Sequence, residues 1–274
     1  MVRHVYVIEF VSSWITKGNP MRLQIYLTID RPFAIPIDYQ AFTSAAIYSF
    51  VSAGDVDYGH FVHDEGYVVA GKAFKPFTHS WLRIPASARR IVGDQLRIAP
   101  GAVEWVVSSP LDDFLQPFAS GLLQSGSLRV GNEELAIREI AAVPAPEITE
   151  SMRLTCLSPI VASTRRPDGS TQFLRPSDGP AVFSEAIRKN LVAKHAALFG
   201  APPVDDRLEV VFDPEYLARR GGGTKLTRYK GTDIIGILAP FTATGSTELI
   251  RLGYDAGFGT RGAQGFGCVE VRQR

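Results

Sequence analysis

The sequence contains few cysteines. Its 274 residues include only two, Cys156 and Cys268, which lie far apart and form no C-x-x-C pair. A disulfide framework or a cysteine-based zinc site needs paired or clustered cysteines, so the sequence predicts neither. Two spare thiols suit a reducing compartment, and we expect a cytoplasmic protein.

Long apolar runs are also absent. No stretch approaches the roughly 18 residues needed to cross a bilayer. Glu9 interrupts the apolar stretch near the N-terminus, and no small-residue cleavage site follows it. This pattern argues against a signal peptide or a membrane anchor, so no membrane partner is expected. Because Met21 begins a better first strand, residues 1–20 are interpreted as an N-terminal extension or the product of a misplaced start.

The chain has no overall excess of positive charge. Lys and Arg total 29 against 28 Asp and Glu, a net charge of +1. Local clusters remain at 89–90, at 165–166 and above all in RRGGGTKLTRYKG (219–231), which has no acid. In this last segment Lys225, Arg228 and Lys230 alternate with Leu226 and Tyr229, which favours a hairpin that contacts phosphates over a merely solvated face.

Two similar successions of elements can be followed along the chain. The first has a strand at 22–29, a helix at about 38–53, strand-like pieces within 74–84, 95–99 and 102–109, a helix at 111–126 and strands at 127–130 and 135–143. Pro144 and Pro146 are typical of a linker. The second has a strand at 152–163, a loop at 165–170, a helix at 180–200, a strand at 207–212, the basic hairpin, a helix at 246–257 and a strand at 267–271. We therefore predict an α+β protein of two tandem ferredoxin-like β-α-β-β-α-β domains, residues 21–145 and 146–274.

The stretch GFGTRG (257–262) fits the dinucleotide-binding pattern G-x-G-x-x-G. A nucleotide-binding fold needs a strand before the glycines, a helix after them and an acid about 20 residues further on. Here a predicted helix precedes the glycines, a short strand follows them, and Arg274 is the last residue. The context thus excludes a nucleotide cofactor, and no other cofactor is expected.

The glycines form a longer pattern, G-F-G-x₅-G-F-G, with Gly257, Gly259, Gly265 and Gly267 at its ends. Glycines allow positive φ and the close approach of another chain. We expect unhindered backbone N–H groups, with Arg261 at their centre, to face anionic oxygens. The alternative is a mobile surface loop with two turns.

The stretch LGYDAGFGTRGAQGFGCVEV resembles the C-terminal glycine-rich motif of the RAMP superfamily, and in particular that of the CRISPR repeat-processing endoribonucleases. Residues 155–163, TCLSPIVAS, are similar to the strand that opens this family's second domain. The resemblance extends from Met21 to the C-terminus. It implies a protein that binds CRISPR repeat RNA, with the glycine segment, Arg261 and the basic hairpin (Lys225, Arg228, Lys230) on the RNA backbone. Other effector-complex proteins are possible partners.

The resemblance also implies cleavage without metal, by attack of a ribose 2′-OH on the adjacent phosphate to give a 2′,3′-cyclic phosphate and a 5′-OH. A base, an acid and a cation are needed, and histidine suits the first two because its pKa lies near neutral pH. The five histidines are His4, His60, His63, His79 and His195. The family's histidine context matches FVHDEG best, which indicates His63. The family's tyrosine matches Tyr48 in an Ile-Tyr pair.

Helix geometry supports a site role for Tyr48. Projected at about 100° per residue, an apolar stripe that includes Phe42, Ile47 and Phe50 faces away from Tyr48, with Ser44 and Ser52 beside the tyrosine. For the cation, Lys72 ranks slightly above Lys75.

Several alternatives stay open. His60 competes with His63 as the catalytic histidine. The pattern H-x-x-H-D-E could bind zinc, but no third ligand has suitable spacing, so no metal is predicted. A non-catalytic RNA-binding subunit of a CRISPR effector complex is the second hypothesis for function.

Overall fold

The computed structural model describes residues 22–272. This part of the chain divides into two compact units, one of residues 22–65 and 81–145 and the other of residues 66–80 and 146–272. The chain passes between the units after Glu65, Ser80 and Ala145. The expected division at 145/146 is one of these passages, whereas the segment 66–80 was not expected in the second unit. The extension predicted for residues 1–20 lies outside the described residues.

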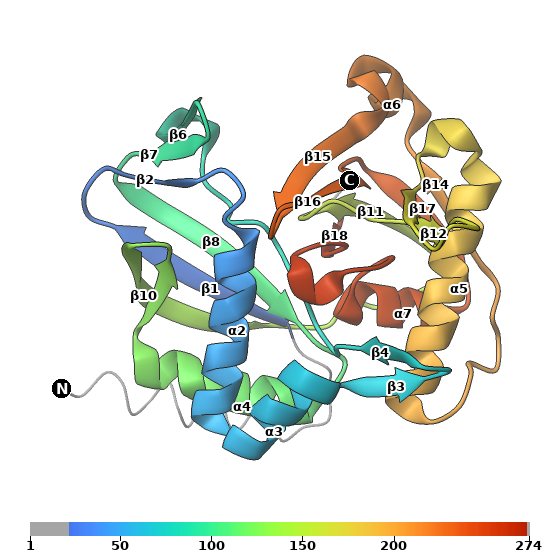
Figure 1. Ribbon diagram of the computed structural model, residues 1–274, viewed down its shortest axis with the longest axis horizontal. Helices are drawn as coiled ribbons and strands as arrows, with labels where there is room; N and C mark the ends of the chain where they lie inside the picture. The colour runs from blue at the N-terminus through green and yellow to red at the C-terminus, as the bar shows by residue number, and fades with distance from the viewer. Residues whose placement is uncertain (1–21, 273–274) are drawn as a thin grey trace. The chain divides into compact units, whose positions relative to one another are not determined.

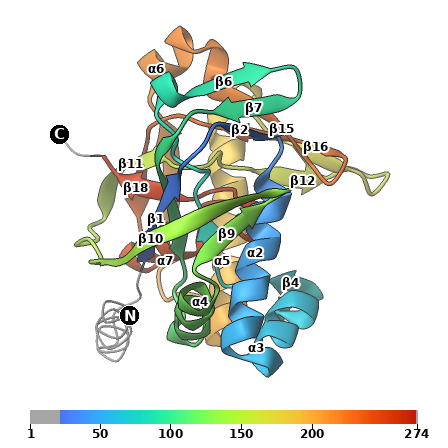
Figure 2. The same ribbon diagram turned by 90° about the vertical axis from the view of Figure 1, so that its left-hand side faces the viewer.

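The first unit is built on an antiparallel sheet. Strands β8 (Gly101–Ser108), β1 (Arg22–Ile29), β10 (Glu133–Val143) and β9 (Ser127–Val130) lie in that order, as the β1, β9 and β10 ribbons of Figure 2 show. In β1 every second residue, from Leu23 to Ile29, is buried. This alternation places one apolar face of the strand in the core, and the predicted strand at 22–29 is confirmed.

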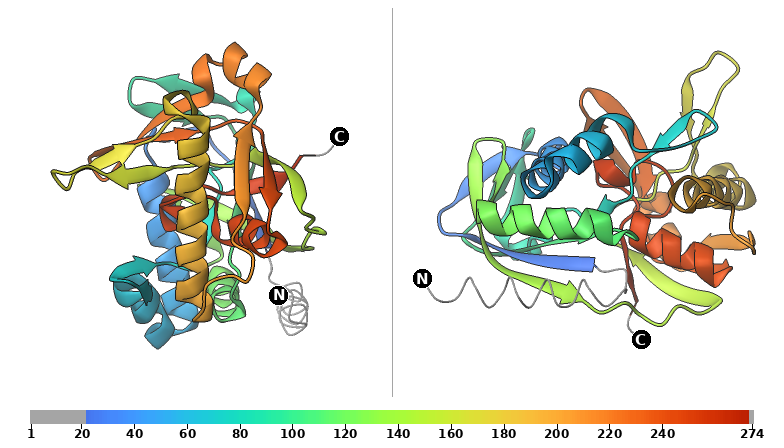
Figure 3. Two further views of the ribbon diagram at one scale, coloured as in Figure 1. Left: turned by 90° about the vertical axis from the view of Figure 1, so that its right-hand side faces the viewer. Right: turned by 90° about the horizontal axis from the view of Figure 1, so that it is seen from below.

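Helices α2 (Gln40–Gly54) and α4 (Asp112–Ser125) cover one side of this sheet (Figure 3, right). Both helices were predicted, and they pack against each other through glycines. A Cβ at Gly121 would overlap the carbonyl oxygen of Phe50, and a Cβ at Gly54 would overlap that of Pro117. The helix backbones therefore touch directly, because neither crossing point carries a side chain.

The remaining elements of the first unit lie between or beside these. Helix α3 and a π-helical turn follow α2, and three short strands form a separate antiparallel sheet in the order β2-β7-β6. Their bounds are α3 (Val56–His60), the π-turn (Phe61–Glu65), β2 (Phe33–Pro36), β6 (Arg89–Val92) and β7 (Gln95–Ile98).

The second unit has the ferredoxin-like strand order. Its sheet runs β14 (Leu208–Phe212), β17 (Phe241–Gly245), β11 (Ser151–Cys156), β18 (Val269–Val271), which is 2-3-1-4 in chain order. Helix α5 (Pro180–Phe199) joins β11 to β14, and α7 (Thr247–Ala256) joins β17 to β18 (Figure 1). The predicted tandem ferredoxin-like fold is confirmed.

Some strand predictions were wrong in both domains. The strand expected at 152–163 ends at Cys156, where the amides of Leu157 and Ser158 both turn to the Cys268 carbonyl. The strand-like stretch 74–84 forms only the short strand β5 (Thr78–His79), apart from the end of β4 at Phe74 and a bridge at Arg83. The basic hairpin is a separate two-stranded ribbon, β15 (Thr224–Tyr229) with β16 (Thr232–Ile237), and β17 is the third strand of the main sheet.

The other short elements belong to the second unit as well. A hairpin of β12 and β13 contains the predicted loop 165–170 and projects away from α5 (Figure 3, left), and β3 and β4 form a second hairpin. Their bounds are β12 (Ser163–Arg165), β13 (Thr171–Phe173), β3 (Tyr67–Val69), β4 (Lys72–Phe74) and α6 (Pro214–Arg219).

The glycine crossing of α2 and α4 yields a stability prediction. Gly121→Ala is expected to lower the free energy of unfolding by about 1–3 kcal/mol, because the added methyl group forces the two backbones apart. Gln124→Ala, at an exposed position of the same helix, is the control and is expected to change it by less than ~0.5 kcal/mol. Urea unfolding measures both, and equal effects would contradict the direct backbone contact.

Candidate functional site

His63 is positioned by helix α3, which follows α2 and packs back against it. Helix α3 begins at the N-cap Asp55, whose carboxylate accepts a hydrogen bond from the Tyr58 amide. The α3 backbone then packs on α2, because a Cβ at Gly59 would overlap Ser52. One helical turn after Gly59 lies His63, and one turn before Ser52 lies Tyr48. An antiparallel pair of helices brings such positions together.

Tyr48 and His63 are in contact. Their ring centroids are 5.0 Å apart, with the planes at 85° in an edge-to-face arrangement. The Nδ1 atom of His63 lies 2.6 Å from the Oδ1 atom of Asp64. The His63 side chain is 63% exposed, so a substrate can reach it. It stands on the π-turn Phe61–Glu65, an irregularity that is frequent at functional sites.

The other histidines differ in their surroundings. His60 is exposed, and no hydrogen bond, ion pair or ring contact is recorded for it within the described chain. The ring nitrogens of His195 lie 2.7 Å from the Ala201 carbonyl oxygen and 2.8 Å from a Glu248 carboxylate oxygen, as a structural histidine would. His4 lies outside the described residues.

His79 is completely buried in the second unit. Burial lowers the pKa of His79 to about 4, although its bond to the Ser80 carbonyl acts in the opposite direction. A histidine that stays neutral and enclosed at pH 7 is a packing residue.

The buried face of α2 differs from the predicted stripe. Thr43 and Ser44 are buried, whereas Phe42 is 40% exposed. The direct crossing with α4 rotates the helix so that small side chains face inward. Tyr48 is half-buried, at the edge of the buried face rather than opposite to it.

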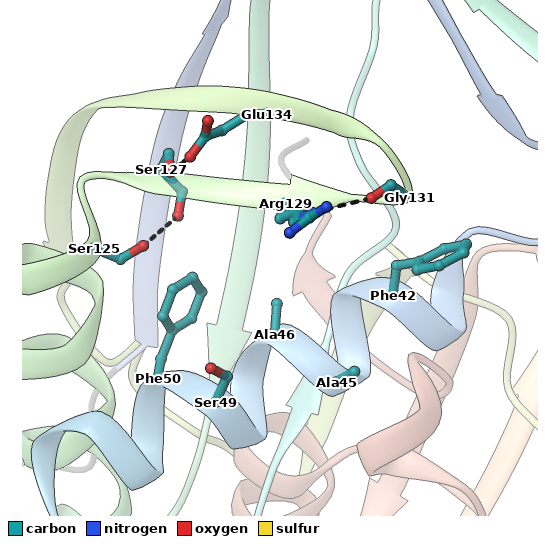
Figure 4. A pocket seen from close by; sticks show the side chains of 10 residues that line it. All are labelled: Phe42, Ala45, Ala46, Ser49, Phe50, Ser125, Ser127, Arg129, Gly131 and Glu134. Atoms are coloured by element: carbon teal, nitrogen blue, oxygen red, sulfur yellow. Dashed lines mark hydrogen bonds between the residues drawn. The ribbon is translucent and has the colours of Figure 1, made fainter.

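Phe42 contributes to a pocket of about 460 Å³ between α2 and the β9–β10 hairpin (Figure 4). Arg129 and Glu134 line the opposite wall, while neither Tyr48 nor His63 lines the pocket. The pocket is thus separate from the Tyr48–His63 pair.

Lys72 is held by α5 within the second unit. With the Asn190 amide oriented to satisfy both neighbours, its oxygen accepts from Lys72 Nζ at 3.2 Å and its nitrogen donates to the Gly259 carbonyl at 2.6 Å. The Lys72 ammonium also lies 4.7 Å from the centroid of the Phe74 ring. Its partial burial lowers the pKa of Lys72. The alternative, Lys75, lies against Gly66.

Lys194, one turn after Asn190, is a buried cation that sequence reasoning missed. Its Nζ donates to the carbonyls of Ala256 and Gly257 at 2.9 and 2.7 Å, at the C-terminal end of α7. Burial, with a smaller contribution from the charge of Lys72, lowers the pKa of Lys194 to about 7. The only sequence signal is the i, i+4 spacing that puts Asn190 and Lys194 on one helix face.

The glycine segment is packed inside the second unit. Phe258 N donates to the Gly267 carbonyl, Gly267 N to that of Pro159 and Gly265 N to that of Gly262. The expectation of unhindered amides is therefore wrong for Gly265 and Gly267, because their N–H groups already have partners. Gly257, Gly259, Gly265 and Gly267 are all buried.

The short strand β5 explains why these positions are glycines. A Cβ at Gly257 would lie 2.9 Å from Thr78 Oγ1, and a Cβ at Gly265 would lie 2.7 Å from the His79 ring. The Thr78 hydroxyl donates to the Phe266 carbonyl at 2.9 Å, and that of Ser158 to the His79 carbonyl at 3.1 Å. The side chains of Thr78 and His79 thus pack directly against the backbone of the glycine segment.

Arg261 lies at the turn of this segment, half-buried, with φ of 69°. Its guanidinium donates to Gln264 Oε1 at 2.9 Å and lies 5.7 Å from the centroid of the Phe173 ring on β13. Burial lowers the pKa of Arg261, and the neighbouring Tyr229 of β15 acts in the opposite direction. Arg261 therefore lies close to the β12–β13 hairpin and to the basic hairpin β15–β16.

The basic hairpin carries its cations on the surface. Lys225, Arg228 and Lys230 are exposed, while Thr227 is buried. Arg228 Nε lies 2.9 Å from Asp233 Oδ1, its direct cross-strand neighbour on β16. The pair neutralises part of the charge expected from the sequence of β15 alone.

A family model of the CRISPR-associated protein Cas6, N-terminal, matches residues 34–141, and a model of the Cas6 C-terminal part matches residues 143–271. The CRISPR-associated endoribonuclease Cas6 1 of Methanocaldococcus jannaschii is 30% identical over 254 residues, which cover 91% of this chain and 92% of that protein. The chain belongs to the Cas6 family.

Two solved structures agree with this assignment. A CRISPR-associated protein Cas6 is 28% identical and superimposes with a TM-score of 0.74, covering 93% of this chain and all of that one. A RAMP protein described as binding different RNA substrates has a TM-score of 0.76 at 23% identity, over 92% of this chain and 100% of that chain, and supports the fold. Within residues 22–272, no helix of this Cas6 protein has the length and apolar character of a membrane span.

The packing of the glycine segment predicts that two Gly→Ala substitutions lower the free energy of unfolding by different amounts. Gly267→Ala and Gly231→Ala both place a methyl group at positive φ, 76° and 80°, but only the first overlaps another backbone group, the Phe258 carbonyl. We expect Gly231→Ala to lower the free energy of unfolding by about 1–2 kcal/mol and Gly267→Ala by about 3 kcal/mol or more, since overpacking adds to the strain. Chemical denaturation measures the difference, and similar losses would indicate an open glycine loop.

The depressed pKa of Lys194 predicts a pH dependence of stability. Between pH 7 and the usual lysine pKa the unfolded chain binds a proton that the folded state lacks, so the free energy of unfolding rises with pH. Relative to Lys194→Met, the wild type is expected to gain up to about 1.4 kcal/mol per pH unit across this window. Urea unfolding at pH 7 and 9 tests it, with the exposed Lys189→Met on the same helix as control. A wild type that gains nothing relative to Lys194→Met would contradict the buried-amine assignment.

Proposed function

We propose that this Cas6 protein is a metal-independent endoribonuclease that cuts CRISPR precursor RNA within its repeats. The observation that carries the proposal is the contact of Tyr48 with His63, whose ring is in turn hydrogen-bonded to Asp64. A ring nitrogen oriented by a carboxylate is the arrangement by which proteins prepare histidine for proton transfer. The name of the M. jannaschii relative gives independent support for RNA cleavage.

In the proposed reaction His63 transfers the protons. When His63 Nδ1–H donates to Asp64, Nε2 carries the lone pair and can accept the 2′-OH proton. The 2′ oxygen then bonds to phosphorus, the bond from phosphorus to the 5′ oxygen breaks, and the leaving oxygen takes the proton that His63 had accepted. The products are a 2′,3′-cyclic phosphate and a 5′-OH. The Tyr48 hydroxyl would orient the 2′-OH or donate to it.

Lys72 is the proposed stabiliser of the charge that develops on the phosphorane. Its ammonium is already partly desolvated and oriented by Asn190, which reduces the reorganisation needed when an anion forms. The assignment to Lys72 rests on this contact with Asn190, and Lys75, which lies against Gly66, is the alternative.

The RNA-binding proposal for the second unit rests on side chains. Arg261, Lys225, Arg228 and Lys230 would contact the RNA backbone, and Tyr229 and Phe173 lie beside Arg261 as flat surfaces on which an unpaired base can stack. The glycines Gly257, Gly259, Gly265 and Gly267 would contribute by shaping this surface, through the close packing described above.

Substitution of the two neighbouring histidines tests the catalytic proposal. His63→Ala is expected to slow single-turnover cleavage of repeat RNA about 10²- to 10⁴-fold, because the proton-transfer group is lost. His60→Ala is the matched control, three residues away on the same exposed segment, and is expected to cut at close to the wild-type rate. The assay contains EDTA, and mass spectrometry identifies the fragment ends.

The outcomes separate the hypotheses. A wild type that shifts repeat RNA on a gel but never cuts it is a non-catalytic RNA-binding subunit of an effector complex. Loss of cutting in His60→Ala with activity retained in His63→Ala would exchange the two assignments. Cleavage that EDTA abolishes would contradict the metal-independent mechanism.

A further inference from the structure

The small sheet β2-β7-β6 of the first unit carries two arginines directly opposite each other. Arg90 on β6 pairs in register with Arg97 on β7, and Ala34 on β2 continues the same row. Residues in register share a face of the sheet, with Cβ atoms roughly 5 Å apart. The two guanidinium groups therefore extend from neighbouring positions on one surface.

This surface faces solvent. Ile35, Leu96 and Ile98 point to the other face and are buried, whereas Ala34, Arg90 and Arg97 are exposed. All four residues of β6 are exposed, and in β7 Arg97 is exposed between two buried residues, so both arginines face outward. Neither arginine side chain forms a hydrogen bond, ion pair or ring contact with the described residues.

The arginine pair lacks a compensating acid. Within residues 85–99 the one carboxylate is Asp94, in the turn of the hairpin, and it accepts a hydrogen bond from Gln95. Like charges directly opposite in an antiparallel sheet destabilise it. An arrangement that costs stability in the free protein is relieved when an anion lies between the two cations.

A cavity of about 540 Å³ adjoins the pair. Its lining includes Arg89, Arg90, Arg97 and Phe33. This size is that of a small-molecule site, large enough for a nucleotide and not only for an ion. Guanidinium groups match phosphate geometry. Phe33 and Arg89 are both in register with Ile98, so they lie on the opposite face of the sheet from Arg90 and Arg97.

We propose that Arg90 and Arg97 form a phosphodiester-binding site for RNA on the first unit. The proposal rests on the proposed RNA function and adds a contact that lies apart from the Tyr48–His63 pair. Figure 1 shows β6 and β7 at one end of α2 and α3 at the other, and the helix from Gln40 to Tyr48 spans about 12 Å. The site therefore binds a part of the RNA outside the bond that is cut.

A salt titration with charge-matched variants tests the site. The probe is 2′-O-methyl repeat RNA, which keeps the phosphates but lacks the attacking hydroxyl. For single strands each neutralised phosphate contributes about 0.7 to the slope of log K against log salt, so the double variant Arg90→Gln, Arg97→Gln is expected to lose about 1.4 of slope. The corresponding rise in Kd is roughly 10- to 30-fold at 0.1 M salt.

Two further variants locate the effect. Arg129→Gln with Arg138→Gln removes the same charge from exposed positions on β9 and β10 and is expected to keep the wild-type slope. Arg90→Lys with Arg97→Lys keeps the charge and is expected to keep the slope, with a smaller rise in Kd because the bidentate geometry is lost. Without RNA, Arg97→Gln is expected to melt at the wild-type temperature or above, whereas a structural arginine would lower Tm.

The result that overturns the inference is a double glutamine variant with the slope and Kd of the Arg129, Arg138 control. Cleavage of natural repeat RNA is measured alongside, and the double glutamine variant is expected to need roughly 10- to 30-fold more protein to reach half of its maximal cleavage rate, in proportion to the rise in Kd. A wild type that neither binds nor cuts repeat RNA would contradict the proposed function itself. Normal cutting with unchanged affinity in the double variant would remove only the arginine site.

Discussion

The second unit depends on a close contact between the side chains of residues 77–80 and the backbone of the glycine-rich turn, where a Cβ atom would not fit. The segment 77–80 crosses the glycine-rich turn so closely that Thr78 and His79 occupy the space of the missing Cβ atoms of Gly257 and Gly265. The Thr78 and Ser158 hydroxyl groups join the two segments by hydrogen bonds. Because 77–80 comes from the first half of the chain, the second unit is completed by residues that precede its other part by about 70 positions.

The same contact organises the cations near the segment. Asn190 and Lys194 project from one face of α5: Lys194 satisfies the last carbonyls of α7, and Asn190 joins the Gly259 carbonyl to the Lys72 ammonium. The glycine segment, the α7 terminus and the β3–β4 hairpin are thereby linked through a single helix. A buried amine beside a second lysine is costly to keep charged. The carbonyls of Ala256, Gly257 and Gly259 each accept a hydrogen bond from this network, which fixes its position.

Sequence periodicity predicted which segments form helices and strands better than it predicted which side of each element is buried. The strand at 22–29 and the helices α4, α5 and α7 follow from alternation, helix start signals and glycine stops, which are local properties. The inward rotation of Thr43 and Ser44 on α2 depends on the glycine contact with α4, and no pattern within α2 contains that information. Likewise the glycine pattern indicated that another segment packs closely against it. That this segment is 77–80 depends on the tertiary structure and cannot be deduced from the pattern. Tyr48 and His63 were chosen by resemblance, and their contact arises from the Gly59–Ser52 packing.

Net charge is a poor guide to what this protein binds. The sum of +1 averages over ion pairs such as Arg188 with Glu185 and Asp206, which cancel on the outer face of α5. An RNA strand responds to the charges within a Debye length of its phosphates, about 8–10 Å, and not to the total. Residues 85–99, which carry the arginines of β6 and β7, contain one acid, Asp94, and Arg228 of β15 pairs with one, Asp233. Two short hairpins, one in each unit, therefore present positive potential on a nearly neutral molecule, because a two-stranded ribbon exposes a row of side chains without having to bury their charge.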